Sequence, residues 1–237
     1  MKVSLNWLND YIETGLDTEE IAEVLSDLGF PCEGIEHIGD DTVLDVEVTS
    51  NRGDCLSLLG IARELAAATG KELKMPEVSP DESDKDITEF AVVEIAEPNL
   101  CPRYTARIIE GVKIGPSPDW LSKRVEAIGL RSVNNVVDAT NYAMIETGQP
   151  PHAFDYDKIV DGKIIIRKAA SGESIVSIDG TTCDLNPDML IIADPRGPVA
   201  VAGVMGGLDT EVSETTSTIL LEDACFDPIS IRTTSLA

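Results

Sequence analysis

The sequence predicts an α+β protein in which a small α/β N-terminal domain precedes a larger, β-rich, barrel-like domain with flanking helices. Three observations support this fold class. Apolar residues recur at helical spacing near the N-terminus, short apolar segments separated by turn residues fill the last third, and a Pro-, Ser- and acid-rich segment lies between the two regions. We therefore expect domains at residues 1–75 and 89–237, joined by an acidic linker at 76–88.

The N-terminal domain is expected to contain two helices and a strand. Asp17 and Glu20 form a capping box that begins a helix ending at Gly29. Residues 42–49 alternate between apolar and acidic side chains, which is typical of a half-buried strand. A second amphipathic helix is expected over residues 54–70. Core packing explains both helices, and neither carries a chemical signature.

The second domain begins with expected strands over 90–96 and 103–110. Ser117 and Pro118 predict the start of a helix that ends at Gly129, with Ser117 as its cap and Pro118 in its first turn. A further helix is expected over about 135–147. After residue 163 the pattern is almost entirely β, with short strands at regular spacing that indicate a barrel or sandwich, before a final helical segment capped by Asp227 and Pro228.

Composition narrows the range of possible functions. The 237 residues carry a formal net charge of −25, so the chain should on average repel nucleic acid, whose binding depends on Lys and Arg. An acidic surface also fits a salt-rich cytoplasm. No apolar run approaches a membrane span or a signal peptide. The five scattered cysteines fit reduced thiols in a cytoplasmic protein better than a disulfide framework or a zinc site.

The segment 129–155 draws attention because His152 follows two prolines and a dense polar run that includes Thr140 and Asn141. Short polar side chains are unusual in a surface helix because they compete with the backbone for hydrogen bonds. A rigid Pro-Pro loop can aim one imidazole into a site. A structural histidine bonded to a nearby carbonyl is the alternative, and the residues alone leave both open.

Two further features could contribute to the same site. Residues 202–207 run from an apolar strand into glycines, where a ligand can approach the backbone, although a tight barrel corner explains such glycines equally well. Glu222 follows an apolar run, and an inward carboxylate there needs a partner or a ligand, whereas an outward one does not. Common nucleotide-binding, hydrolase and metalloprotease motifs are absent, and two distant histidines make a histidine metal cluster unexpected.

Several long motifs resemble one family. GLRSVNNVVDATNY, GQPPHAFD, PVAVAGVMGGLDTEV and ILLEDACFDPISIR resemble the B3/B4 editing region of bacterial phenylalanine–tRNA ligase (phenylalanyl-tRNA synthetase) beta chains. MKVSLNWLNDYI and TSNRGDCLSLLGIARELAAATGK resemble the B1 domain of the same family. The resemblance covers nearly the whole chain outside the linker. It implies a B1-like domain, a B3/B4-type domain and a cytoplasmic translation enzyme.

The resemblance also implies an editing pocket that hydrolyses tyrosine wrongly esterified to tRNA(Phe). By motif, Thr140 and Asn141 would be the TNY pair of the pocket, and His152 the histidine of the HAFD segment. Glu222 would read the tyrosine hydroxyl, while His152 and Asn141 orient the ester, the terminal adenosine or the attacking water. The pocket wall would be formed by the AGVMGG segment, at Ala202, Gly203 and Gly206. Whether His152 acts as a base stays open, because the terminal ribose hydroxyl could position the water instead.

Some family features are absent from this sequence. The usual OB-fold tRNA-binding insertion would fall between Ile35 and Asp41, where only five residues stand, and Ser50-Asn51-Arg52-Gly53 replaces the usual TPNRPD run. The family continues beyond the position of Ala237 into further pocket-bordering and catalytic-like modules. ATP and Mg²⁺ are therefore expected for the whole synthetase and no cofactor or metal for this segment. The implied partners are the alpha subunit of an α2β2 assembly, tRNA(Phe) and phenylalanine or tyrosine esters, without a membrane.

Three functions compete at this point. The first is the editing portion of a synthetase beta chain. The second is a structural and interaction module of the heterotetramer that is inactive in isolation, which the −25 charge favours. The third is a separate protein that edits in trans.

Overall fold

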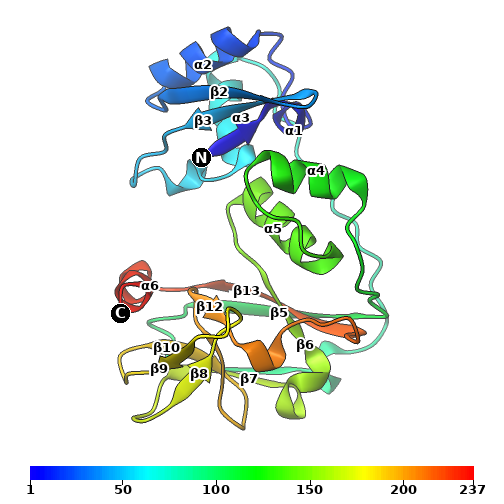
Figure 1. The fold of residues 1–237 in the computed structure, drawn as a ribbon, viewed down its shortest axis with the longest axis vertical. Coiled ribbons are helices and arrows are strands. Elements are labelled where there is room, and N and C mark those ends of the chain that lie inside the picture. The colour runs from blue at the N-terminus through cyan, green and yellow to red at the C-terminus, as the bar shows by residue number, and fades with distance from the viewer. The chain divides into compact units, whose positions relative to one another are not determined.

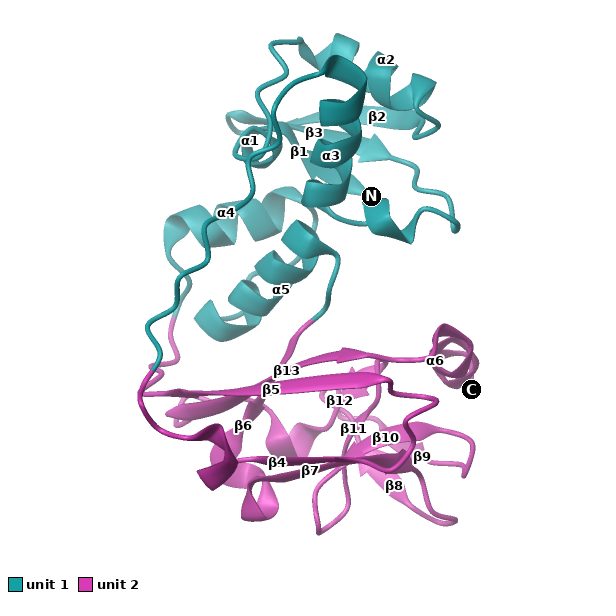
Figure 2. Ribbon diagram, turned by 180° about the vertical axis from the view of Figure 1, so that it is seen from behind, with its two compact units in different colours: residues 1–82, 116–150 teal, residues 83–115, 151–237 magenta.

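The computed structural model describes residues 1–237, which divide into two compact units. Unit 1 comprises residues 1–82 and 116–150, and unit 2 comprises residues 83–115 and 151–237 (Figure 2). The predicted domain boundaries differ from these units at residues 116–150, which pack with the N-terminal segment; the boundaries at 75/76 and 88/89 stay predictions.

Unit 1 is an α/β unit with a three-stranded antiparallel sheet of order β1-β3-β2 (Figure 1). Its elements are β1 (Lys2–Ser4), α1 (Leu5–Leu8), α2 (Thr18–Asp27), β2 (Cys32–Ile38), β3 (Asp41–Val46), a 3-10 turn (Gly53–Cys55), α3 (Leu58–Thr69), α4 (Asp119–Ala127) and α5 (Asn135–Thr147). One core holds them together, because Trp7, Leu44 and Leu65 are fully buried in a single cluster that Tyr142 and Ile145 of α5 also contact.

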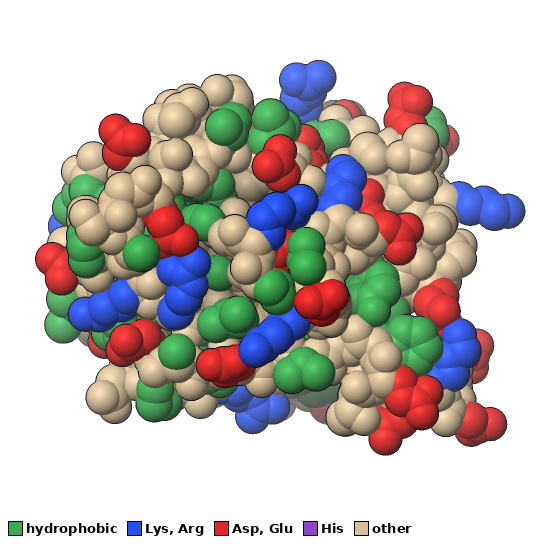
Figure 3. Space-filling view, turned by 90° about the horizontal axis from the view of Figure 1, so that it is seen from below, with side chains coloured by type: hydrophobic (Ala, Val, Ile, Leu, Met, Phe, Trp, Pro, Cys, Tyr) green, Lys and Arg blue, Asp and Glu red, His purple; other side chains and the backbone are tan.

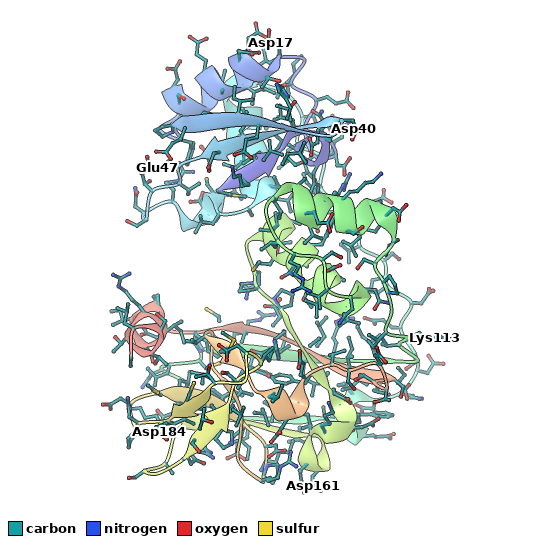
Figure 4. All side chains as sticks on the ribbon, viewed as in Figure 1. Asp17, Asp40, Glu47, Lys113, Asp161 and Asp184 are labelled. Atoms are coloured by element: carbon teal, nitrogen blue, oxygen red, sulfur yellow. The ribbon has the colours of Figure 1, made fainter.

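The predicted capping box of α2 is confirmed. The Asp17 carboxylate accepts a hydrogen bond from the Glu20 backbone N–H, and the Glu20 carboxylate accepts one from the Asp17 backbone N–H, both at 2.9 Å. Asp17 is labelled at the start of α2 in Figure 4. Two donors that the first helical turn leaves unpaired are thereby satisfied.

Two helix starts differ from the sequence predictions. The helix expected from Asp54 begins at Leu58, where Ser57 caps it by accepting from the Gly60 N–H, and a separate 3-10 turn precedes it. Ser117 does not cap α4, because its hydroxyl donates to the Asp138 carboxylate, and Pro118 takes the cap position. Strand β2 was not predicted, because its residues lack the strong alternation of β3.

Unit 2 is β-rich and consists of two main sheets and a small hairpin (Figures 1 and 2). One sheet has five strands in the order β12-β11-β10-β7-β4, the second has the order β5-β13-β6, and β8 pairs with β9. The elements are a 3-10 turn (Ile87–Glu89), β4 (Val92–Ile95), β5 (Arg103–Glu110), β6 (His152–Asp155), two 3-10 turns (Tyr156–Lys158 and Val160–Gly162), β7 (Lys163–Lys168), β8 (Ser174–Val176), β9 (Thr182–Asp184), β10 (Leu190–Ala193), β11 (Pro198–Val201), β12 (Met205–Gly206), a 3-10 turn (Leu208–Thr210), β13 (Thr218–Cys225) and α6 (Pro228–Ser235).

The two sheets pack face to face around one apolar cluster. Ile166 and Ile192 of the larger sheet share this cluster with Phe154 and Leu220 of the three-stranded sheet. Strand β10 is buried on both faces, because Ile191 contributes to a second cluster beneath the β8-β9 hairpin. The predicted α+β class with a β-rich second region is confirmed, and the sheets stay open rather than closing into a barrel.

Candidate functional site

Strand β13 places Glu222 in the middle of the three-stranded sheet of unit 2. In the antiparallel registers, Glu222 lies opposite His152 of β6 on one side and Ala106 of β5 on the other. Residues directly opposite each other in such a pair point to the same face. His152 and Glu222, seventy positions apart in the sequence, therefore share the inner face, and the question of whether Glu222 points inward or outward is settled in favour of inward.

Tyr104 joins this pair from the third strand. It lies opposite Ala224 of β13, two residues from Glu222, so it occupies the neighbouring position on the same face. Tyr104 lies in the strand predicted over 103–110, and the sequence pattern gave it no functional role. A buried phenol needs a hydrogen-bond partner, and that requirement was the signal that could have singled it out.

These three side chains, which we call the polar trio (Tyr104, His152 and Glu222), each have one buried polar atom without a hydrogen-bond partner. Tyr104 is 9% exposed and Glu222 is 5% exposed. The Tyr104 Oη, the His152 Nε2 and the Glu222 Oε2 atoms are buried and have no hydrogen-bond partner. Because the large majority of buried polar atoms in proteins are paired, three unpaired atoms on adjacent strands indicate a place for a ligand or ordered water.

The polar trio carries little charge near neutral pH. Burial raises the pKa of Glu222 to about 8, and the nearby Asp223 adds to the rise while Tyr104 opposes it. Burial also lowers the pKa of His152 to about 4 and raises the pKa of Tyr104. Tyr104 and Glu222 are close enough to affect each other's pKa, although Oη and Oε2 do not reach hydrogen-bond geometry. The site is thus a set of neutral donors and acceptors.

Gly206 contacts the histidine of the polar trio. A Cβ atom added at Gly206 would lie 2.7 Å from His152 Cε1 and 2.8 Å from Ile178 Cδ1, so only glycine fits beside the ring. On another side the imidazole packs edge-on against Phe154, with ring centroids 4.4 Å apart. The predicted grouping of Gly206 with His152 therefore corresponds to a direct contact.

The other two predicted wall residues, Ala202 and Gly203, also belong to unit 2. Ala202 is fully buried within the cluster between the sheets. Gly203 has a φ of 64°, and the side chains nearest to it are Ile231 of α6 and Phe226. Their role in a pocket stays a prediction.

Thr140 and Asn141 lie on α5, which belongs to unit 1. The Thr140 hydroxyl donates to the Val137 carbonyl one turn earlier, which satisfies it within the helix. Their predicted grouping with His152 stays a prediction.

Part of the polar run before α5 has a structural role. Asn134 caps the helix by accepting from the N–H groups of Val136 and Val137. The fully buried Asp138 accepts from the hydroxyls of Ser117 and Ser132 and from a backbone N–H. Capping and anchoring of α5 thus explain two of the residues that suggested a site.

Other polar groups and surface hollows offer weaker candidates. Asp54, Cys55 and Glu64 cluster in unit 1, but Arg52 pairs with both carboxylates, so their charges are already compensated. One surface hollow follows α6 and a second lies beside Lys158 and Arg196, and neither contains the polar trio. No helix in the structure is long and apolar enough to cross a membrane.

Comparison with known proteins gives a consistent family. Residues 100–237 match the sequence model of the B3/4 domain. The chain is 47% identical over 235 residues to the phenylalanine–tRNA ligase beta subunit of Rhodopirellula baltica, which covers 99% of this chain and 34% of that protein. It is 52% identical over 220 residues to the beta subunit of Moorella thermoacetica, covering 92% of this chain and 27% of that protein.

A solved structure is similar in fold. An N-terminal fragment of the phenylalanyl-tRNA synthetase beta subunit from Pyrococcus horikoshii superimposes with a TM-score of 0.51 at 16% identity, covering 100% of this chain and 72% of that one. At this identity the likeness concerns the fold alone. The chain spans only about a quarter to a third of the length of its curated relatives.

Proposed function

The chain belongs to the B3/4 domain family and is a relative of phenylalanine–tRNA ligase beta subunits, and from this premise we propose that it carries an editing site, which hydrolyses the ester of tyrosine wrongly attached to tRNA(Phe). The observation that supports this proposal is the polar trio, since three buried and unpaired polar atoms offer hydrogen bonds to a neutral hydroxyl group.

Such a site has the selectivity that editing of tyrosine requires. Tyrosine and phenylalanine differ by one hydroxyl group, so a hydrophobic pocket cannot separate them strongly. A site whose buried groups bond that hydroxyl rejects phenylalanine, because phenylalanine would leave them unpaired, and such sites can discriminate by about 10⁴-fold or more. Glu222 is the residue to which we assign recognition of the phenol, since it is the most buried polar group of the polar trio.

The other predicted residues would position the reacting ester. The neutral imidazole of His152 can accept a proton or orient the ester carbonyl, because its pKa lies near 4. In the proposed site, Thr140 and Asn141 hold the terminal adenosine or the water, and the segment with Ala202, Gly203 and Gly206 forms the wall. The terminal ribose hydroxyl of the tRNA remains an alternative means of positioning the water.

We place this activity within a larger synthetase. The chain would act in an assembly of beta and alpha subunits that charges tRNA(Phe) in the cytoplasm, with ATP and Mg²⁺ used by parts outside this segment. A net charge of −25 opposes strong binding of tRNA by this segment, so other parts of the assembly would supply most of the affinity.

A second candidate function is a structural module of the synthetase that has no activity of its own. The same negative charge favours it. Editing in trans by the separate chain is the third candidate.

Deacylation of Tyr-tRNA(Phe) distinguishes these functions. We would measure hydrolysis by this chain and by a synthetase assembly that includes it, each with Glu222→Ala, His152→Ala and the exposed control Glu214→Ala. We expect the first two substitutions to slow tyrosine release by at least tenfold in the assembly and Glu214→Ala to have no effect. Unchanged release in Glu222→Ala would refute the assignment of the phenol reader. Hydrolysis by the assembly but not by the chain alone would support the second candidate function, a structural module that has no activity of its own.

A further inference from the structure

The proposed editing function leaves Tyr104 without a role, although its hydroxyl is one of the three unpaired buried atoms. We propose that Tyr104 is a further specificity-determining residue, which binds the hydroxyl of the ligand together with Glu222, so that two groups recognise one phenol. This inference rests on the proposed function and adds a second reader to the same site.

The strand registers place the two readers side by side. Glu222 lies opposite Ala106, and Tyr104 lies opposite Ala224, so the two readers are diagonal neighbours on the same face. Diagonal neighbours of this kind lie within reach of long side chains on the same face of a sheet. The residues opposite them are both alanines, so no long side chain lies between the two polar groups on this face.

The surroundings of Tyr104 and Glu222 provide no other hydrogen-bond partner. Phe154 and Leu220 on the same face are fully buried and apolar, and His152, the third polar group there, also has an unpaired nitrogen. Leaving a buried donor or acceptor unpaired costs about 1–3 kcal/mol. A ligand hydroxyl has one hydrogen-bond donor and two acceptor positions. It can therefore pair with both the Tyr104 hydroxyl and the protonated carboxyl of Glu222, which have no other partner.

The charges around Glu222 favour its neutral form. His152 faces it from β6, and because burial lowers the pKa of this imidazole to about 4, it is neutral at pH 7. The buried Cys101 thiol before β5 is also neutral, because burial raises its pKa to about 11. Asp223, the next residue of β13, disfavours a negative charge on Glu222. Strand β12 consists of Met205 and Gly206 and adds no charged side chain. No cation faces the carboxyl, so its pKa of about 8 results from burial, and Tyr104 lowers this value in part.

This arrangement defines the class of ligand group. A carboxylate or phosphate would find no cation, and an ammonium group would find no ionised carboxylate at neutral pH. An uncharged hydroxyl on an apolar ring fits, because Phe154 and Leu220 provide apolar contacts beside the two readers. Phenylalanine would leave both readers unpaired.

The test compares single-atom deletions in the synthetase assembly that includes this chain. Tyr104→Phe removes the proposed reader, and Tyr156→Phe is the matched control because the Tyr156 hydroxyl already donates to the Phe90 carbonyl at 2.7 Å. We expect Tyr104→Phe to reduce kcat/KM for Tyr-tRNA(Phe) about tenfold, the loss of one hydrogen bond, without reducing the slower hydrolysis of Phe-tRNA(Phe). Tyr156→Phe should leave the tyrosine-to-phenylalanine ratio unchanged.

The pH profile separates this role from simple packing. After subtraction of uncatalysed hydrolysis, wild-type kcat/KM for the tyrosine ester should fall above pH 8 as Glu222 ionises. Tyr104→Phe should move this decline to higher pH, because Tyr104 lowers the Glu222 pKa. Glu222→Gln should abolish the decline. An unchanged ratio together with an unmoved decline in Tyr104→Phe would overturn the inference.

A binding measurement keeps the inference independent of hydrolysis. The ¹³C signal of the Glu222 carboxyl, assigned with Glu222→Gln, would be titrated in the whole chain with tyrosinamide and with phenylalaninamide. We expect only tyrosinamide to shift it, and Tyr104→Phe to weaken that effect and raise the Glu222 pKa. If these shifts occur but Tyr-tRNA(Phe) is not hydrolysed, the editing proposal is refuted, whereas joint binding of the hydroxyl by Tyr104 and Glu222 is supported. If neither amide shifts the signal, the paired readers are refuted.

Discussion

At the residue scale, Glu222 shows how one buried carboxyl changes the pH dependence of stability. Its pKa is near 8 in the folded chain and near the usual 4.5 when unfolded. The folded state therefore holds the proton more tightly, so the free energy of unfolding decreases as pH rises from about 4.5 to about 8 and then levels off. A hydrogen-bonded surface carboxylate has the opposite dependence.

We expect Glu222→Gln to stabilise the chain at alkaline pH. The amide has nearly the same shape and cannot ionise, so the variant should exceed wild type by a few kcal/mol at pH 9, at about 1.4 kcal/mol per unit of pKa shift. The difference should shrink toward pH 5. Urea unfolding at several pH values measures it, with Glu214→Gln as the exposed control; a difference that does not vary with pH would contradict the burial of an ionisable Glu222.

The sequence predicted only part of the site at this scale. His152 and Glu222 were singled out by their sequence context and then by motif resemblance, and they lie opposite each other in the strand register. Tyr104 lies in the strand predicted over 103–110 but received no role, because alternation along one strand does not show which residues it meets across the sheet. The absence of hydrogen bonds to these atoms could not be read from a sequence at all, since it depends on every residue packed nearby.

At the scale of elements, α3 depends on one glycine. A Cβ atom at Gly60 would lie 2.1 Å from the Asp54 carbonyl oxygen and 2.8 Å from the Cys55 Cα, both backbone atoms of the preceding 3-10 turn. The first turn of α3 can therefore pack against that turn only without a side chain at position 60.

We expect Gly60→Ala to destabilise unit 1 by about 1–3 kcal/mol, since the backbone must move to relieve the overlap. Gly53→Ala is the matched control, because no heavy atom lies within 4 Å of its added Cβ and its φ is not positive. Thermal unfolding followed by circular dichroism compares the two. Equal melting temperatures for both variants would show that the turn and α3 do not pack as described.

Elements with local signals were predicted well. The capping box of α2, helix α5 with its glycine end, strand β5 and the start of α6 at Asp227 all agree with the structure. Strand β6 was expected to be a loop, because the two prolines before His152 hide a four-residue strand whose pairing depends on β13. Ser117 was misassigned as a cap since its distant partner Asp138 competes for its hydroxyl.

At the scale of the whole molecule, charge dominates. The chain has 43 Asp and Glu residues against 18 Lys and Arg. On the face of the molecule shown in Figure 3, acidic and basic side chains are interspersed among apolar ones, and Figure 4 labels Asp40, Glu47, Asp161 and Asp184 among the acidic residues of the two units. Mutual repulsion among so many like charges destabilises a compact state.

We expect added salt to stabilise the chain. Raising NaCl from 0.05 to 1 M shortens the screening length from over 10 Å to about 3 Å, so the net repulsion should weaken. A gain of about 1–2 kcal/mol would raise the melting temperature by roughly 2–8 °C in a protein of this size. Calorimetry across a NaCl series measures this, with an equal series of uncharged sucrose to reveal salt-independent effects. A melting temperature that falls with NaCl would show that favourable ion pairs outweigh the repulsion.

The connectivity of the two units has a genetic consequence. Residues 116–150 leave unit 2 after β5 and return at β6, and both strands pair with β13, where Glu110 lies opposite Thr218 and His152 opposite Glu222. The excursion thus has the form of an insert spliced between two strands of one sheet. A gene that joins Gly115 to Pro151 through a short flexible linker would encode unit 2 as an uninterrupted polypeptide. Cutting within 76–88 would instead divide unit 1 and separate α5 from the core that its Tyr142 and Ile145 contact.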